Sequence, residues 1–278
     1  MGLAGPPEWL WLSALFLFGL IFGSFGNVVI WRFPRGESLS HPGSHCPSCG
    51  SPIAWYDNVP LLSWVLLRGR CRMCQAPISA RYPTVELLSG LLWLAAGVRF
   101  GFSLMTLAAV VFFYLLLLLA FIDWDTMRLP NPLVALLAAL GLLGATVAQF
   151  TGLPMVPLLS QGSGALSQPL VGAIVGAAGS AGVVLAIALI YRFVRKTQGF
   201  GMGDVKLLAA IGVFLGLYGL MAMFIGTFVG AVYGVVSARR SGESLRHKFP
   251  FGPFLAIGAV LTVLFGQVAW VWYLGLIG

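Results

Sequence analysis

Long apolar runs separated by polar segments dominate the hydrophobic pattern of the chain. About 20 consecutive apolar residues suffice to cross the hydrocarbon core of a bilayer, so we interpret these runs as membrane-spanning helices. The predicted spans cover residues 9–31, 84–98, 104–122, 132–150, 168–191, 204–219, 220–237 and 254–276. The second and sixth are short, and a count of six or seven would merge spans around Gly219. The pattern predicts an all-α polytopic membrane protein with about eight transmembrane helices.

Two of the predicted connections stand out from the shorter ones. Residues 32–83 form a polar insert, rich in Pro, Gly, Ser and Cys, between the first and second spans. Residues 151–167 carry no charge and are predicted to form a flexible external loop. The chain is therefore expected to divide into a first transmembrane helix (1–31), a small insert (32–83) and a larger transmembrane domain (84–278).

The composition agrees with this picture. The chain has 278 residues, of which 59% are hydrophobic and 9% charged, whereas a soluble globular protein carries about a quarter charged residues. Composition therefore excludes an ordinary soluble domain. The first apolar run is too long for the core of a signal peptide and has no basic residue before it, so we expect it to be retained.

The basic residues indicate the orientation of the spans. The net charge is +8, yet nearly all Lys and Arg lie in alternate loops, with Arg99 on the opposite side. This positive-inside pattern predicts that the insert is cytoplasmic and that both termini are not. It also accounts for the charge without a nucleic-acid partner, and none is expected. The residues concerned are Arg32, Arg35, Arg68, Arg70, Arg72, Arg81, Arg128, Arg192, Arg195, Lys196, Lys206, Arg239, Arg240, Arg246 and Lys248.

The insert contains two pairs of cysteines, in the sequences CPSC and CRMC. Two such pairs supply four thiolates, which suit a tetrahedral zinc site without an open position, so a structural zinc ion is expected. A small insert with few large apolar residues gains stability from such a link. A cytoplasmic location disfavours disulfides, and four free cysteines remain the alternative. The expected ligands are Cys46, Cys49, Cys71 and Cys74, whereas His41 and His45 are expected to be solvated.

Three carboxylates lie where an apolar run ends or begins. Asp123 and Asp125 end the third span, and Asp204 opens the sixth. Ionisable residues in such places are costly and by default indicate a function. The two span ends lie at the same face in the predicted topology, so Asp123 and Asp204 can meet. Glu86 is expected in the first turn of the second span, where its charge favours the helix dipole.

Glycines precede Asp204 in the sequence GFGMGD. Gly199, Gly201 and Gly203 leave the backbone without side chains and permit positive φ, so an extended substrate could approach the carboxylate closely. A GxGD sequence alone is a weak signal, because glycines also serve helix packing in membranes. A helix N-cap aspartate remains the alternative for Asp204.

Six motifs, in order along nearly the whole chain, resemble those of the type IV prepilin peptidases, members of the GxGD aspartic proteases. The resemblance implies that Asp123 and Asp204 form the catalytic pair, that Gly201 and Gly203 belong to the active-site loop, and that residues 84–278 are the catalytic domain. Asp125 is then a neighbouring polar residue. The motifs are GSFGNVVIWRFPRGES, the two CxxC pairs, ISARYPTVELLSG, IDWDTMRLPN, GMGDVKLLAAIG and PFGPFLAIGA.

The resemblance also implies a reaction and a location. An aspartic endopeptidase of the bacterial inner membrane, with its active site facing the cytoplasm, would remove the short basic leader of type IV prepilins or pseudopilins after a glycine. It would then methylate the new amino terminus from S-adenosylmethionine, a step for which no residue is assigned. The family often has Leu at Gly26 and Asp at Asn131, and neither position belongs to the expected pair. No oligomeric state follows from the sequence.

Two other functions fit the same residues. A transporter could use Asp123 and Asp204 as a cation or proton relay, and a membrane scaffold could bind partners through the insert. The peptidase hypothesis requires Asp123 and Asp204 to act together and to share one proton. The ionised carboxylate would then activate a water molecule, and the protonated carboxyl group would donate a hydrogen bond to the scissile carbonyl.

Overall fold

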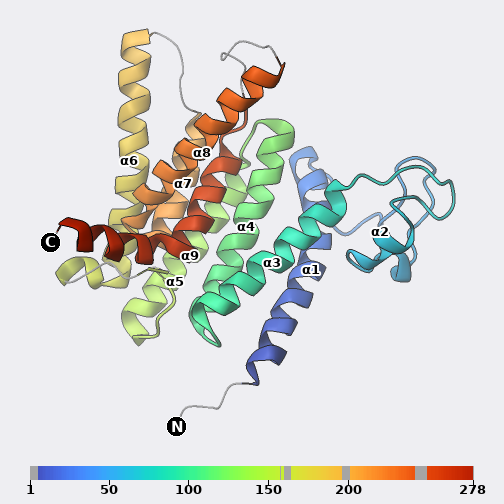
Figure 1. Cartoon of the computed structure of the whole chain (residues 1–278), viewed down its shortest axis with the longest axis horizontal. Coiled ribbons are helices and arrows are strands. Elements are labelled where there is room, and N and C mark those ends of the chain that lie inside the picture. The colour runs from blue at the N-terminus through green and yellow to red at the C-terminus, as the bar shows by residue number, and fades with distance from the viewer. Residues whose placement is uncertain (1–5, 157, 160–163, 196–200, 242–248, 278) are drawn as a thin grey trace. The chain divides into compact units, whose positions relative to one another are not determined.

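The structure is a computed structural model that describes residues 6–156, 158–159, 164–195, 201–241 and 249–277 (Figure 1). Gly199, Lys196, Arg246 and Lys248, which the sequence analysis singled out, lie outside the described residues. All regular elements within these ranges are helical, and the β-contacts are the isolated bridges His45–Pro52 and Arg70–Pro77. The predicted all-α class is confirmed.

Eight long helices match the eight predicted spans. They are α1 (Glu8–Arg32), α3 (Arg81–Phe100), α4 (Leu104–Thr126), α5 (Asn131–Thr151), α6 (Pro169–Arg195), α7 (Met202–Leu215), α8 (Tyr218–Ser241) and α9 (Gly252–Ile277). Six of them are long and apolar enough to cross a membrane, and α3 and α7 are not among the six. At 1.5 Å per residue, α7 is only about 21 Å long, shorter than the hydrocarbon core of about 30 Å.

The chain forms two compact units, Met1–Phe102 and Ser103–Gly278. In the first unit α1 packs along α3, and a Cβ atom added to Gly23 would lie 2.7 Å from the Cα of Glu86. Small residues thus let the two backbones approach closely, as in other membrane helix pairs. The insert between them contains the short helix α2 (Leu62–Leu66) and the 3₁₀ turns Phe33–Arg35 and Trp55–Asp57.

In the second unit glycines again set the closest helix contacts. α6 packs on α7 where a Cβ atom on Gly176 would overlap the backbone of Gly216 and Gly212, and α8 packs on α9 through Gly226 and Gly258. α4, whose last turn contains Asp123, contacts α5 and α9. The packing brings the carboxyl end of α4 close to the amino ends of α5 and α9.

The junction between α7 and α8 lies earlier than predicted. α7 ends at Leu215 and α8 begins at Tyr218, so the break falls at Gly216 and Leu217 rather than at Gly219. Gly216 has φ 58°, a left-handed conformation that favours glycine. The helices are therefore separate, and the prediction erred by a few residues in the position of the turn.

The connection between α5 and α6 is more ordered than the predicted flexible loop. Val156, Leu158 and Leu159 are almost fully buried, and the Leu158 N–H donates to the carbonyl of Phe214 at 2.7 Å. A 3₁₀ turn, Gly164–Ser167, precedes α6. The described part of this uncharged segment therefore packs on α7, because its leucines and valine bury apolar surface.

Candidate active site and metal site

Asp123 lies in the last turn of α4 and is only 5% exposed. Its Oδ2 accepts a hydrogen bond of 2.8 Å from the backbone N–H of Gly252, the first residue of α9. The helix ends just beyond, where Met127 adopts φ 50° and donates its N–H to the carbonyl of Asp123. A buried carboxylate is thus held in place by the amino end of a distant helix.

Asp204 is the third residue of α7 and is half-buried. The N-cap of this helix is Gly201, and the Asp204 Oδ2 accepts the Gly201 N–H at 3.3 Å. Asp204 is therefore not the N-cap residue of α7, as the alternative interpretation predicted, although its side chain accepts the N–H of the N-cap residue Gly201. Gly203 faces Leu129, whose Cβ would lie 3.3 Å from an added Cβ.

Asp123 and Asp204 lie within electrostatic range of each other, so a negative charge on one carboxyl group disfavours a negative charge on the other. The helix ends around them are joined by further contacts: the Lys206 Nζ of α7 donates to the Asn131 Oδ1 at the start of α5, at 2.9 Å. α5 and α9 begin beside the carboxyl end of α4, and the start of α7 contacts the start of α5. Helix N-termini carry partial positive charge, so these helix ends stabilise a negatively charged carboxylate that lies between them.

Gly252 and an aromatic cluster beside it were not identified as functional from the sequence. Ring centroids lie 5.8 Å apart for Trp124 and Tyr233, 5.1 Å for Tyr233 and Phe254, and 5.7 Å for Phe249 and Phe254. Trp124 follows Asp123 in the chain, and Phe254 follows Gly252 by two residues. Gly252 lies within the PFGPFLAIGA motif, but a backbone N–H donor carries no side-chain signature in a sequence. Asp125, in contrast, is exposed.

The four cysteines of the insert come together as predicted. Their sulfur atoms all lie within 4.8 Å of one another, and the Sγ atoms of Cys46 and Cys74 are 3.9 Å apart. Zn–S bonds of about 2.3 Å in a tetrahedron separate sulfur atoms by about 3.8 Å, so the cluster fits a metal ion. A disulfide needs about 2.05 Å, and the cysteines are free. His41 and His45 are exposed and outside the cluster, as expected.

The two cysteine pairs form similar backbone knuckles. The N–H of Cys46 donates to Ser51 and that of Cys71 to Ala76, both at 2.9 Å. Gly50 and Gln75, which follow the second cysteine of each pair, have φ values of 71° and 59°. Each turn thus places two sulfur atoms in the cluster of four cysteines.

The crowded thiols influence one another. Hydrogen bonds from Ser51 lower the pKa of Cys49 to about 6. The pKa of Cys74 rises to about 11: the Ala76 N–H lowers it, but burial and the three neighbouring cysteines outweigh that effect. Four thiolates therefore do not coexist easily in this cluster without a cation, which is the behaviour of a metal site.

Glu86 does not occupy the predicted first turn. α3 begins at Arg81 and no acidic residue lies in its first turn. Pro83 is tolerated there because the first N–H groups of a helix need no helical partner. Glu86 is 8% exposed, and its Oε2 accepts the N–H of Leu61 at 2.9 Å. The carboxylate is thus buried against the insert rather than at the helix terminus.

Comparison with known proteins matches both parts of the chain. Residues 17–100 match the Bacterial Peptidase A24 N-terminal domain, and residues 110–235 match the Type IV leader peptidase family. A Prepilin leader peptidase/N-methyltransferase of Aeromonas hydrophila is 37% identical over 297 residues, covering 98% of this chain and 97% of the relative. The protein of the same description from Klebsiella pneumoniae is 40% identical over 77% of this chain and 89% of the relative. No solved structure matches.

Proposed function

The chain belongs to the type IV leader peptidase family, and from this premise we propose that it cleaves prepilins or pseudopilins through Asp123 and Asp204. It is a peptidase with N-methyltransferase activity and a multi-pass protein of the bacterial inner membrane. The observation that supports the proposal is that two carboxylates, one in the last turn of α4 and one in the first turn of α7, lie within electrostatic range of each other. The catalytic part would then lie within residues 84–278.

The two carboxylates would divide the chemistry of peptide hydrolysis. Adjacent carboxyl groups share one proton, because two like charges at short distance destabilise each other. The ionised member would take a proton from a water molecule as that water attacks the scissile carbonyl, and the protonated member would donate a hydrogen bond to the carbonyl oxygen. The surrounding helix N-termini would stabilise the negative charge that develops there.

The surroundings of the pair suit the proposed substrate. A prepilin joins a short basic leader to an apolar helix, and cleavage follows a glycine between them. The cluster of Trp124, Tyr233, Phe249 and Phe254 would receive the apolar side of the cut, while Gly201 and Gly203 would leave room for the backbone of the substrate. Purified protein in detergent should therefore cut a synthetic prepilin at the leader junction, as judged by product mass.

Two cofactors belong to the proposed function. A structural zinc ion would be held by Cys46, Cys49, Cys71 and Cys74, since a site of four thiolates leaves no position for a substrate. S-adenosylmethionine would supply an electrophilic methyl group to the free amine of the new amino terminus.

Gly252 offers a test of the geometry around Asp123. A Cβ atom at this position would lie 2.8 Å from the Asp123 Oδ2 and 3.2 Å from its Cγ, so Gly252→Ala should displace the carboxylate. We expect the cleavage rate to fall by about 10²-fold, because misplacement by about 1 Å can have this effect. Gly275→Ala on the same helix, where nothing lies within 4 Å, is the matched control. Equal activity of the two variants in a prepilin cleavage assay would refute the role of the Gly252 contact.

A cytoplasmic insert predicts sidedness of thiol labelling. An impermeant maleimide applied to spheroplasts should not reach the native cysteines until the membrane is opened and zinc is chelated. Phe102→Cys should react in intact spheroplasts, because this exposed residue lies in the turn between α3 and α4, against Trp11 near the start of α1. Labelling of the insert from outside would overturn the proposed orientation.

A further inference from the structure

The short helix α2 of the insert presents an uncovered apolar face. Leu62, Val65 and Leu66 are exposed by 54%, 63% and 71%. Residues three and four apart lie on one side of a helix, so these three side chains form one surface, which we call the α2 face. A surface helix normally turns its apolar side toward the core, and a contiguous exposed apolar patch commonly marks a surface that binds a partner or a membrane.

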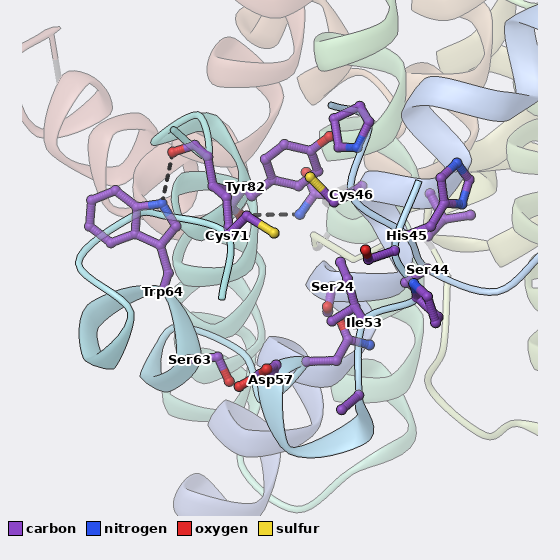
Figure 2. A pocket seen from close by; sticks show the side chains of 18 of the residues that line it. Ser24, Ser44, His45, Cys46, Ile53, Asp57, Ser63, Trp64, Cys71 and Tyr82 are labelled. Atoms are coloured by element: carbon purple, nitrogen blue, oxygen red, sulfur yellow. Dashed lines mark hydrogen bonds between the residues drawn. The ribbon is translucent and has the colours of Figure 1, made fainter. Parts of the chain in front are cut away.

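Hydrogen bonds fix the rotation of α2 so that the α2 face stays outward. The buried Ser63 donates its hydroxyl to the carbonyl of Tyr56 at 3.0 Å. The Trp64 Nε1 donates to the carbonyl of Ile78 at 3.1 Å (Figure 2). Both side chains also line a pocket of the insert. The polar contacts of α2 are therefore made on its inner side, and the apolar face is left for something outside the first unit.

The position of α2 in the first unit brings it to the level of the membrane surface. The N–H of Leu61, directly before α2, donates to the Glu86 Oε2 at 2.9 Å. Glu86 is five residues beyond the start of α3 at Arg81, which is about 7.5 Å along the helix axis. The headgroup layer is about 5–8 Å thick on each side of a bilayer. Ser24 of α1 and Tyr82 of α3 border the same pocket as the inner side of α2 (Figure 2). α2 thus begins beside the helix turns that cross the headgroup layer.

The residues around the α2 face carry the charge and the aromatic ring that suit a lipid surface. Arg68 and Arg70 follow α2 and are exposed. The ion pair found in the described part of the chain joins Arg72 to Asp57, so neither of the other two arginines has a carboxylate partner there. Trp55, 83% exposed in the turn that contacts α2, is of the type enriched at membrane interfaces. Anionic headgroups complement the arginines, and acyl chains complement the leucines and valine. The basic leader of a prepilin would be repelled here.

We propose that α2 docks the insert on the anionic surface of the bilayer. Leu62, Val65 and Leu66 then reach the boundary between headgroups and acyl chains, and Arg68 and Arg70 lie among the phosphates. Docking holds the cysteine-rich insert at a fixed depth beside α1 and α3. The inference is independent of the cleavage chemistry and of either cofactor. Its rivals are that the second unit of the chain, or a second copy, covers the α2 face.

Photo-crosslinking from the centre of the α2 face identifies its occupant. p-Benzoylphenylalanine replaces Val65 in the full chain, which is reconstituted with zinc in nanodiscs of phosphatidylcholine alone or mixed equally with phosphatidylglycerol. We expect peptide mass spectrometry to find lipid adducts at this position, with a higher yield in the anionic discs. The same probe at Phe18, 56% exposed on the membrane-spanning α1, is the reference for lipid contact and should give equal yields in both discs.

Charge variants separate lipid attraction from apolar contact alone. Arg68→Gln with Arg70→Gln should lower the adduct yield in anionic discs toward the neutral value, by up to about fivefold for each arginine. Arg239→Gln with Arg240→Gln removes the same charge from the last turn of α8 and should keep the higher yield. Equal yields in the two kinds of disc would refute the attraction to anionic lipid. Absence of lipid adducts, or adducts with peptides of α4 to α9 or of a second copy, would overturn the docking itself.

Discussion

Asp123→Asn and Asp204→Asn are each expected to reduce prepilin cleavage by about 10²–10⁴-fold, the range that a positioned acid or base contributes. Asparagine retains the size of the side chain and an oxygen that can accept the N–H of Gly252 or of Gly201. The fold should therefore survive, while the pair can no longer exchange a proton with water. The measurement is the rate at which purified protein in detergent releases the leader from a synthetic prepilin.

Asp125→Asn is the matched control for this experiment. Asp125 lies two residues from Asp123 in the same turn of α4, but it is exposed, whereas Asp123 is 5% exposed. Its replacement should leave a substantial part of the activity. Robust cleavage by either variant of the pair, with equal amounts of folded protein, would exclude the aspartic-protease mechanism. A cation or proton relay through the two aspartates would then become the leading explanation of their burial.

The sequence predicted most of the candidate site because its signals lie in side-chain chemistry and spacing. Asp123 and Asp204 stand out as carboxylates at the ends of apolar runs, and the cysteine pairs have the spacing of metal knuckles. The eight helices followed from hydrophobicity alone, since backbone groups in a membrane must be satisfied within a helix. Ionisable side chains beside apolar runs and closely spaced cysteine pairs can therefore be recognised from the sequence alone.

The remaining features depend on tertiary contacts that a sequence does not express. Gly252 acts through its backbone N–H, which every residue except proline possesses. Glu86 was misplaced because α3 extends three residues beyond the apolar run, to Arg81, and its burial comes from contact with Leu61 of the insert. The segment around Leu158 is irregular as predicted but packed rather than flexible, because an uncharged segment without periodicity gives no sign of the surface on which it packs.

Removal of the proposed zinc ion is expected to unfold the insert and leave the transmembrane helices intact. Structural zinc contributes about 10–16 kcal/mol of apparent binding free energy in small domains, and the insert has one short α-helix, α2, and few other regular elements to replace it. The double variant Cys71→Ser and Cys74→Ser removes two of the four ligands. Protein purified without chelator should contain about one zinc ion per chain, and the double variant almost none.

Limited proteolysis should then distinguish a structural metal from a catalytic one. In the double variant, residues 38–79 should become sensitive to protease, while the fragment that contains α4 to α9 stays resistant in detergent. His45→Ala is the matched control: His45 precedes Cys46 but is exposed and outside the cluster, so zinc content and protease resistance should not change. An insert that resists protease equally with and without zinc would contradict the structural role, because its fold would then rest on its own contacts alone, among them the Asp57–Arg72 ion pair, in which both hydrogen bonds are shorter than 2.8 Å.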